Sequence, residues 1–248
     1  MKIQISAAAL ALSLVLAGCG GDDSNGTTGV NGSVSNAPLT QIPAPNNGDW
    51  REVVSKTEAG GFLMGNPDAP VKLVEYASLT CPHCATFSAE GAPALRDNYV
   101  RSGQVSWEFR NLLLGAPDVA LSVLARCQAP SAFFRTIEQI FEQQRELLER
   151  IDESEAERIQ PMPPEQQIAP LARAMELDTF FARRGMPEAR FNQCLADTQG
   201  VQELTNMSNR AATEEGVTGT PTFFINGTKQ EVNQWSDLEP QLRTAIGG

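Results

Sequence analysis

Histidine is almost absent from this sequence, because His83 is the only one in 248 residues. A structural zinc site needs about four nitrogen or sulfur ligands, and His83 lies between Cys81 and Cys84, where it can hardly share a metal with both. Cys127 and Cys194 would have to complete the set. We therefore expect no metal and no other cofactor. Attachment of c-type haem is excluded as well, since it requires a histidine directly after the second cysteine, where this chain has an alanine.

Basic residues are also scarce. The chain has 19 Lys and Arg against 30 Asp and Glu, a net charge of -11 and a pI near 4.6. An acidic chain is repelled by phosphate backbones and by anionic lipid headgroups, so we expect no nucleic-acid partner. The content of 41% hydrophobic and 20% charged residues suffices for a buried core. It excludes disordered and fibrous proteins and predicts one globular domain.

The N-terminal segment has the features of an export signal. Residues 1–18 contain Lys2, a short apolar stretch and small residues at its end, a pattern typical of a secretory signal rather than a membrane span. The end of this segment, "LAGC", resembles the lipobox of bacterial lipoproteins, which implies cleavage before Cys19 and acylation of Cys19. A plain signal peptide is the alternative. Residues 19–49 are rich in Gly, Asn, Ser, Thr and Pro, which predicts a flexible tether before a domain at 50–248.

The five cysteines divide into one anchor and two pairs. Cys19 is the predicted lipid site, and Cys81 and Cys84 form a CxxC pair. Export to an oxidising compartment permits disulfides, so a structural bridge between Cys127 and Cys194 is the natural pairing. Such a bridge would close a loop of about 68 residues and contribute on the order of 4 kcal/mol in the chain-entropy model. The alternative is that both are free and buried as small apolar groups.

The pattern of apolar residues predicts an α/β fold. Residues 69–80 form a continuous β-branched and aromatic run that is typical of a strand buried on both faces. A helix with Pro82 in its first turn follows, with a kink expected near Pro93, and a second strand covers 104–114. These elements make a βαβ unit with the CxxC pair at its strand-to-helix corner.

The second part of the chain is mostly helical before strand character returns. Residues 117–215 show helical spacing, including an apolar stripe that indicates core packing rather than a cofactor site. A strand at 220–227 ends in Asn226-Gly227, a hairpin-turn signal, and a terminal helix follows. The sequence therefore predicts a βαβ half and a β-hairpin-α half separated by a helical insertion.

The order of these elements and two of their motifs resemble the DsbA-type thiol–disulfide oxidoreductases, which have a thioredoxin fold. The resemblance covers residues 50–246 in element order. It is carried by "EYASLTCPHC", where CPHC at 81–84 is the DsbA-type active-site sequence, and by "GVTGTPTFFING", which is similar to the family's cis-proline loop. It implies a thioredoxin fold with a helical insertion and disulfide exchange as the activity.

The residue types of the CPHC segment suit disulfide exchange. A thiol at a helix N-terminus is exposed to the positive end of the helix dipole and to free N–H groups, so Cys81 is expected to be the nucleophile with a lowered pKa. His83 is expected to stabilise the Cys81 thiolate, and with it the reduced form, which makes the disulfide a better oxidant. Cys84, one helical turn further on, is the expected resolving cysteine. Pro82 completes the catalytic segment.

Three more site residues follow from the resemblance by position. Pro221 matches the cis-proline that faces the CxxC pair, and the backbone of Thr220 before it would pair with an extended substrate. An ordinary trans proline at a strand start is the alternative for Pro221. Glu75 matches a buried acid that relays the proton of the buried cysteine, and a carboxylate that faces water is the alternative.

We expect the protein to donate its Cys81–Cys84 disulfide to exported proteins in the bacterial periplasm, as a monomer. A membrane redox partner would restore the disulfide. Thr220, where well-known DsbA members have valine, resembles isomerases and reductases of the same fold, so an isomerase or reductase is the alternative. A non-catalytic chaperone or binding module is a third possibility. Gly20 after Cys19 favours the outer membrane for the lipid anchor.

Overall fold

The computed structural model describes residues 38–247. The predicted signal segment, Cys19 and residues 19–37 of the predicted tether lie outside these residues. The last part of that tether lies against the domain: the Ile42 N–H donates to the Ser102 carbonyl at 2.8 Å, and the indole N–H of Trp50 donates to the Ile42 carbonyl at 2.8 Å. Contacts with the domain therefore begin before residue 50.

The described chain contains a six-stranded mixed sheet with the spatial order β1-β2-β4-β3-β5-β6. The strands are β1 (Val54–Lys56), β2 (Phe62–Met64), β3 (Val71–Ala77), β4 (Val105–Asn111), β5 (Thr222–Ile225) and β6 (Thr228–Gln230). Only β3 and β4 are parallel, and every other neighbouring pair is antiparallel. The sequence predicted β3 as the central strand and also predicted β4 and β5. Strands β1 and β2 were not predicted.

The hairpin between β5 and β6 turns at the residues that the sequence indicated. Asn226 and Gly227 have φ values of 50° and 80°. Positive φ at both central residues is the geometry of the two-residue turn whose twist matches a β-hairpin, and asparagine and glycine tolerate it best.

The helix after β3 is broken into three pieces. These are α1 (Pro82–Glu90), α2 (Ala92–Ala94) and the π-helical turn η3 (Leu95–Val100). The break falls at Gly91, two residues before the predicted kink at Pro93. A Cβ atom at Gly91 would lie 2.8 Å from the ring of Phe87 and 2.9 Å from Cβ of Trp235. Glycine thus allows α1 to approach the C-terminal helix α11 (Trp235–Gly247) closely.

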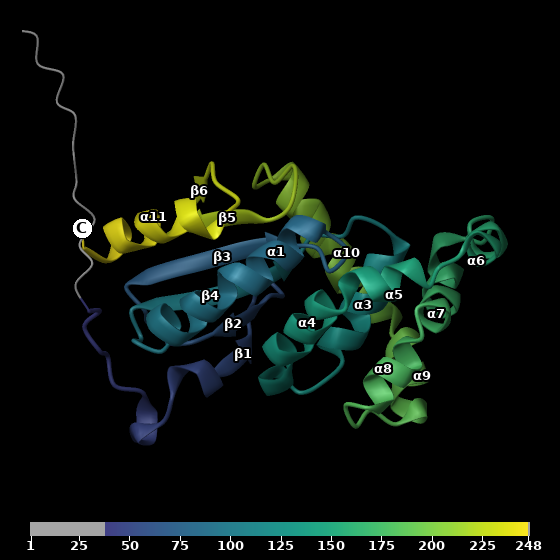
Figure 1. The fold of residues 1–248 in the computed structure, drawn as a ribbon, viewed down its shortest axis with the longest axis horizontal. Helices are drawn as coiled ribbons and strands as arrows, with labels where there is room; N and C mark the ends of the chain where they lie inside the picture. Colours follow the sequence, from purple (N-terminus) through teal and green to yellow (C-terminus); the bar gives the residue numbers. More distant parts are fainter. Residues whose placement is uncertain (1–37, 248) are drawn as a thin grey trace, which may run out of the picture. The chain divides into compact units, whose positions relative to one another are not determined.

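The predicted helical insertion lies between β4 and β5 and forms the right-hand part of Figure 1. Its helices are α3 (Ala116–Arg126), η4 (Pro130–Ala132), α4 (Phe133–Glu142), α5 (Gln144–Glu149), α6 (Glu153–Ile159), α7 (Pro164–Ala174), α8 (Leu177–Ala182), α9 (Glu188–Leu195) and α10 (Thr198–Thr213). The apolar stripe of α4 and α5 is core, as predicted. Its buried members are Phe134, Ile137, Ile140, Phe141 and Leu147. Two short turns, η1 (Pro45–Asn47) and η2 (Trp50–Glu52), precede the sheet.

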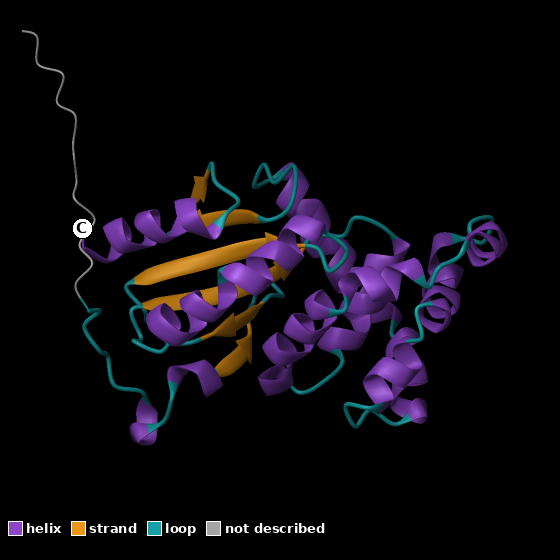
Figure 2. Ribbon diagram, in the orientation of Figure 1, coloured by secondary structure: helices purple, strands orange, loops and turns teal. Residues whose placement is uncertain are grey.

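The two faces of the sheet are covered by different helices. On the central strand β3, Val74 and Tyr76 point to the face that is covered by α10, where they pack with Ala211. Glu75 points to the opposite face and lies opposite Phe223 of β5. The ring of Phe223 contacts Phe87 of α1, with 4.7 Å between the centroids, so α1 covers this second face. Figure 2 shows α1 and the strands beneath it.

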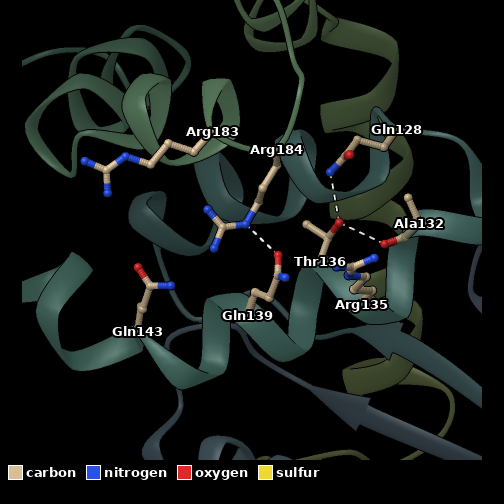
Figure 3. A pocket seen from close by; sticks show the side chains of 8 residues that line it. All are labelled: Gln128, Ala132, Arg135, Thr136, Gln139, Gln143, Arg183 and Arg184. Carbon is tan, nitrogen blue, oxygen red and sulfur yellow. Dashed lines mark hydrogen bonds between the residues drawn. The ribbon is translucent and has the colours of Figure 1, made fainter.

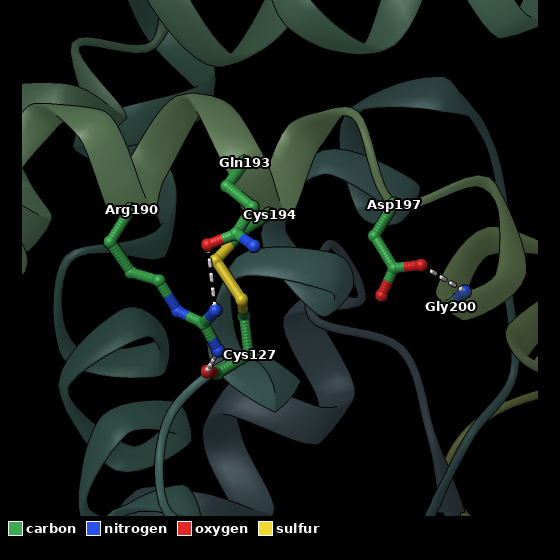
Figure 4. The surroundings of a disulfide bond; sticks show 6 residues. All are labelled: Cys127, Arg190, Gln193, Cys194, Asp197 and Gly200. Atoms are coloured by element: carbon green, nitrogen blue, oxygen red, sulfur yellow. Dashed lines mark hydrogen bonds between the residues drawn. A yellow bond between two sulfur atoms is a disulfide. The ribbon is translucent and has the colours of Figure 1, made fainter.

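A disulfide joins two helices of the insertion. Cys127 follows α3 directly, Cys194 lies in α9, and their Cα atoms are 5.9 Å apart. The guanidinium of Arg190 also donates to the Cys127 carbonyl at 3.0 Å (Figure 4). The Cys127–Cys194 pairing that was predicted from the number of cysteines is confirmed.

Candidate active site

Cys81 caps the N-terminus of α1. Strand β3 ends at Ala77, the N–H of Cys81 donates to the Ser78 carbonyl, and Pro82 is the first helical residue. Proline fits this position because its missing N–H would have no partner in the first turn. The loop therefore places the Cys81 sulfur at the N-terminal end of the helix, where the helix dipole is positive.

The surroundings of Cys81 favour its thiolate. Its pKa is lowered from 9.0 to about 5, first through the hydrogen bond from the Cys84 thiol, with further bonds from the Thr220 side chain and from the main-chain N–H groups of Cys84 and His83. Burial opposes this change. Both cysteines are free thiols in the structure, so these pKa directions apply to the reduced pair.

Cys84 has the opposite character. It is fully buried, whereas Cys81 is 6% exposed. Burial raises the pKa of the Cys84 thiol strongly, and so does the hydrogen bond to Cys81. Glu75 raises it further where its carboxyl group is ionised. One sulfur of the pair is thus poised to ionise at neutral pH and the other to keep its proton, which is the asymmetry that a nucleophilic and a resolving cysteine need.

His83 lies in the first turn of α1, and its side chain is exposed. It lines a cavity of about 280 Å³ together with other residues of α1 and with Asn233, Gln234 and Trp235. Its hydrogen bond to Cys81 comes from the main chain. The role predicted for the His83 side chain in stabilising the thiolate stays a prediction.

The loop before β5 completes the site from the other half of the fold. The Thr220–Pro221 peptide bond is cis, as the sequence predicted. The Cys81 thiol donates to the Thr220 carbonyl, with 3.3 Å between sulfur and oxygen. Thr220 is half-buried and Pro221 is buried. Residues separated by 139 positions in the sequence are thereby in contact at the catalytic sulfur.

Glu75 is buried beneath α1, with 1% of its surface exposed. Its carboxylate accepts a hydrogen bond from the indole N–H of Trp107 at 2.9 Å. Burial raises the pKa of Glu75 from 4.5 to about 8, and the bond from Trp107 opposes this only in part. The water-facing alternative for Glu75 is therefore wrong, and the residue can hold a proton near Cys84 at neutral pH.

Two residues of the helical insertion hold the loop before Cys81, and the sequence analysis did not identify either. Asp118 of α3 is fully buried and accepts hydrogen bonds from the Ser78 hydroxyl at 2.6 Å and the Leu79 N–H at 3.1 Å. Burial raises the pKa of Asp118 to about 6. The Gln144 side-chain amide donates to the carbonyls of Leu79 and Cys81. No local pattern marks these residues, because their partners are more than thirty positions away.

Residues 38–247 contain no group of three or more His, Cys, Asp or Glu side chains that could hold a metal ion. Within the same range, every helix is too short or too polar to cross a membrane.

Comparison with known proteins relates this geometry to a family. The model of the family described as thioredoxin matches residues 57–243. A putative protein-disulfide oxidoreductase of Rickettsia bellii is 25% identical over 197 residues, which are 79% of this chain and 68% of that protein. The chain spans between 57% and 68% of the length of the Rickettsia relatives that it matches.

Solved structures agree with this assignment. The protein-disulfide isomerase from Novosphingobium aromaticivorans has a TM-score of 0.72 and 27% identity, over 75% of this chain and 97% of that one. The α-DsbA1 protein of Wolbachia pipientis shares the fold, with a TM-score of 0.62 and 22% identity over 83% and 94% of the two chains. The family match, these relatives and the cysteine pair at the helix N-terminus together establish that this chain belongs to the thioredoxin family, as a DsbA-like enzyme of the protein-disulfide oxidoreductase type.

Proposed function

We propose that this enzyme donates the Cys81–Cys84 disulfide to exported proteins. The observation that carries the proposal is the asymmetry of the pair, a Cys81 thiol with a pKa of about 5 beside a buried Cys84 with a raised pKa. A stable thiolate stabilises the reduced form, so the oxidised form gives up its disulfide readily.

The reaction follows from the geometry. A substrate thiolate attacks the Cys81 sulfur of the oxidised enzyme, a mixed disulfide forms, and the Cys81–Cys84 bond breaks. The electron pair goes to the Cys84 sulfur, which takes up a proton because its pKa is raised. A second substrate thiolate then attacks the substrate sulfur of the mixed disulfide, and Cys81 leaves as a thiolate. The substrate loses two electrons and the enzyme gains them.

The loop at Thr220 supplies the substrate contact in this proposal. Its carbonyl lies beside the Cys81 sulfur, and an extended substrate segment there would pair with the backbone as an added strand. Such a contact recognises backbone rather than side chains, which suits unfolded or partly folded proteins of many sequences. A membrane partner that carries an oxidised disulfide would accept the two electrons.

The reduction potential tests the proposal. The purified protein is equilibrated in glutathione buffers, and the state of each cysteine is read by alkylation and mass spectrometry. We expect a value near that of strongly oxidising members of the fold, at about -120 mV. A value near that of thioredoxin, about -270 mV, would contradict disulfide donation. Failure of both cysteines to react would favour a non-catalytic chaperone or binding module.

A disulfide isomerase or reductase is the second candidate. The similar Novosphingobium structure is that of a protein-disulfide isomerase, and Thr220 precedes the cis-proline. Disulfide isomerisation and disulfide donation can be distinguished in an assay that starts from a fully oxidised substrate protein with scrambled disulfides. An isomerase restores the native pairing without added oxidant, whereas a disulfide donor acts on the reduced protein.

We further propose that the enzyme is anchored in the bacterial periplasm by a lipid on Cys19, with Gly20 favouring the outer membrane. The lipobox-like end of the signal segment supports the anchor. The Cys127–Cys194 disulfide is consistent with an oxidising compartment, where such bonds persist. C19S is expected to move the protein from the membrane to the soluble fraction. An unchanged distribution would favour a plain signal peptide.

A further inference from the structure

A cavity of about 550 Å³ lies within the helical insertion, apart from the cysteine pair. It is lined by residues of the α3–α4 connection, of α4, of the α4–α5 junction and of the segment after α8: Gln128, Ala132, Arg135, Thr136, Gln139, Gln143, Arg183 and Arg184. Figure 3 shows that these side chains come from two sides, with Arg184 reaching across toward Gln139. The volume is in the range of small-molecule sites, about 300–1,000 Å³.

The charge of this lining is opposite to that of the protein. The whole chain has a net charge of -11, yet the lining contains three arginines and no acid. The pKa of Arg184 is lowered overall, and the negative charge of Glu142 opposes this change. Glu142 does not line the cavity. Three like charges around one hollow repel each other, and an anion between them would relieve this repulsion.

The side chains of two of these arginines have no partner among residues 38–247. All fifteen arginines of the chain lie in the described range 38–247. Within that range only the side chains of Arg101, Arg135 and Arg183 make neither a hydrogen bond nor an ion pair. Two of the three therefore line the same cavity, with their donors available to a ligand.

The third arginine is held in position. Arg184 donates from Nε to the side-chain oxygen of Gln139 at 2.5 Å and from a terminal nitrogen to the Phe180 carbonyl at 2.6 Å, and its guanidinium lies over the Phe180 ring. Burial lowers its pKa, as does the charge of Arg183. A fixed, partly desolvated guanidinium loses little freedom on binding an anion.

We propose that this cavity binds a small oxyanion with at least two carboxylate or phosphate groups. The planar fork of a guanidinium fits both groups with paired hydrogen bonds. The neutral side chains of Thr136, Gln139 and Gln143 provide further donors and acceptors around the charged centre. The lining shares no residue with the CPHC segment or the cis-proline loop, so this inference does not rest on the proposed function.

Isothermal titration calorimetry of the purified protein at pH 7 tests the proposal with two probes, sodium pyrophosphate and sodium citrate. We expect one molecule of at least one probe to bind per chain, more weakly at high salt. R135A and R183A are each expected to weaken binding about tenfold or more, since each removes a charge-assisted hydrogen bond. Both residues are exposed, so the fold should tolerate the changes.

R101A is the matched control, because Arg101 is also exposed and unpaired among the described residues but does not line the cavity. It should bind both probes as the wild type does. Binding of pyrophosphate alone would indicate a phosphate ligand, and binding of citrate alone a carboxylate ligand. Absence of binding by both probes at 150 mM salt and about 10 mM probe would overturn the proposal. Equal weakening by R101A and R135A would overturn it too, since binding would then reflect overall charge.

Discussion

The Gln144 side chain is hydrogen-bonded to the main chain of Cys81. Its amide nitrogen donates to the Cys81 carbonyl at 3.0 Å and to the Leu79 carbonyl at 2.9 Å. Gln144 is the first residue of α5 and is 6% exposed. The helical insertion therefore holds the backbone of the catalytic cysteine directly, and we infer that Gln144 is a positioning residue for the thiolate.

Replacement of Gln144 by glutamate should raise the pKa of Cys81. Q144E exchanges the amide donor for a buried carboxylate of the same shape beside the Cys81 carbonyl, and a negative charge near a thiolate disfavours its formation. We expect the pKa of Cys81, followed by thiolate absorbance against pH, to rise by about one unit or more. The reduction potential should become more reducing.

Two further variants separate the effect of the lost hydrogen bond from the effect of the added charge on the pKa of Cys81. Q144M removes the donor without adding charge, so it should produce a smaller rise. Q143E places the same carboxylate one residue earlier, on a half-buried side chain that faces the arginine-lined cavity, and should leave the pKa of Cys81 unchanged. An equal shift in Q143E and Q144E would show that general charge, rather than the bond to Cys81, sets the pKa.

The stability of the reduced protein should depend on pH through Cys81. In the fold this thiol has a pKa of about 5, whereas a free cysteine has a pKa of about 8.5. Ionised Cys81 therefore stabilises the reduced fold fully above pH about 8.5, and this contribution is lost as the pH falls through about 5. We expect the Tm of the reduced protein minus that of the oxidised protein to increase from pH 5 to pH 8. A difference that does not change with pH would contradict the lowered pKa. So would a Tm of the reduced wild type that changes with pH in the same way as the Tm of reduced C81A.

The features that the sequence predicted well are local or nearly so. The apolar run before Cys81, Pro82 in the first helical turn and Asn226-Gly227 each determine structure within a few residues. These features were sufficient to predict the central strand, the helix N-terminus at the CxxC pair and the β5–β6 hairpin. The cis-proline loop was assigned through resemblance, because an isolated X–Pro bond is usually trans.

The features that the sequence did not reveal depend on distant contacts. Strands β1 and β2 have three residues each, too few for an alternating pattern, and they exist because β2 pairs with β4. Asp118 and Gln144 belong to helices whose sequence indicates only an ordinary insertion. Their hydrogen bonds to residues 78–81 arise when the insertion packs against the sheet end, and no spacing in the sequence encodes this contact.

Removal of the second disulfide should destabilise the protein without changing the catalytic pair. Cys127 and Cys194 are 67 residues apart in sequence, and opening a loop of this length increases the entropy of the unfolded chain. We expect C127A/C194A to lower the free energy of unfolding in urea by about 4 kcal/mol. The reduction potential of Cys81 and Cys84 should stay unchanged. A shift of that potential would show that the second disulfide influences catalysis.

Glu75 should change the stability of the fold with pH in the direction opposite to that of Cys81. Its pKa in the fold is about 8, compared with about 4.3 for an unperturbed glutamate, so the folded state holds a proton that the unfolded state releases. Burial of Glu75 therefore destabilises the fold increasingly as the pH rises from about 4.3 to 8. E75Q keeps the shape of the side chain, and its amide oxygen can still accept the hydrogen bond from the indole N–H of Trp107. In the oxidised protein, its Tm relative to the wild type should increase over this range.

The same variant tests whether Glu75 relays the proton of Cys84. At neutral pH the protonated carboxyl could give its proton to Cys84 when the disulfide opens and take it back when Cys84 attacks a mixed disulfide. E75Q cannot exchange this proton, so the rate of Cys84 attack on a Cys81 mixed disulfide should lose its inflection near pH 8. W107F removes the hydrogen bond that lowers the pKa of Glu75 and should move the inflection to higher pH. If E75Q and the wild type show the same pH profile, Glu75 has no relay function, and its burial only lowers stability.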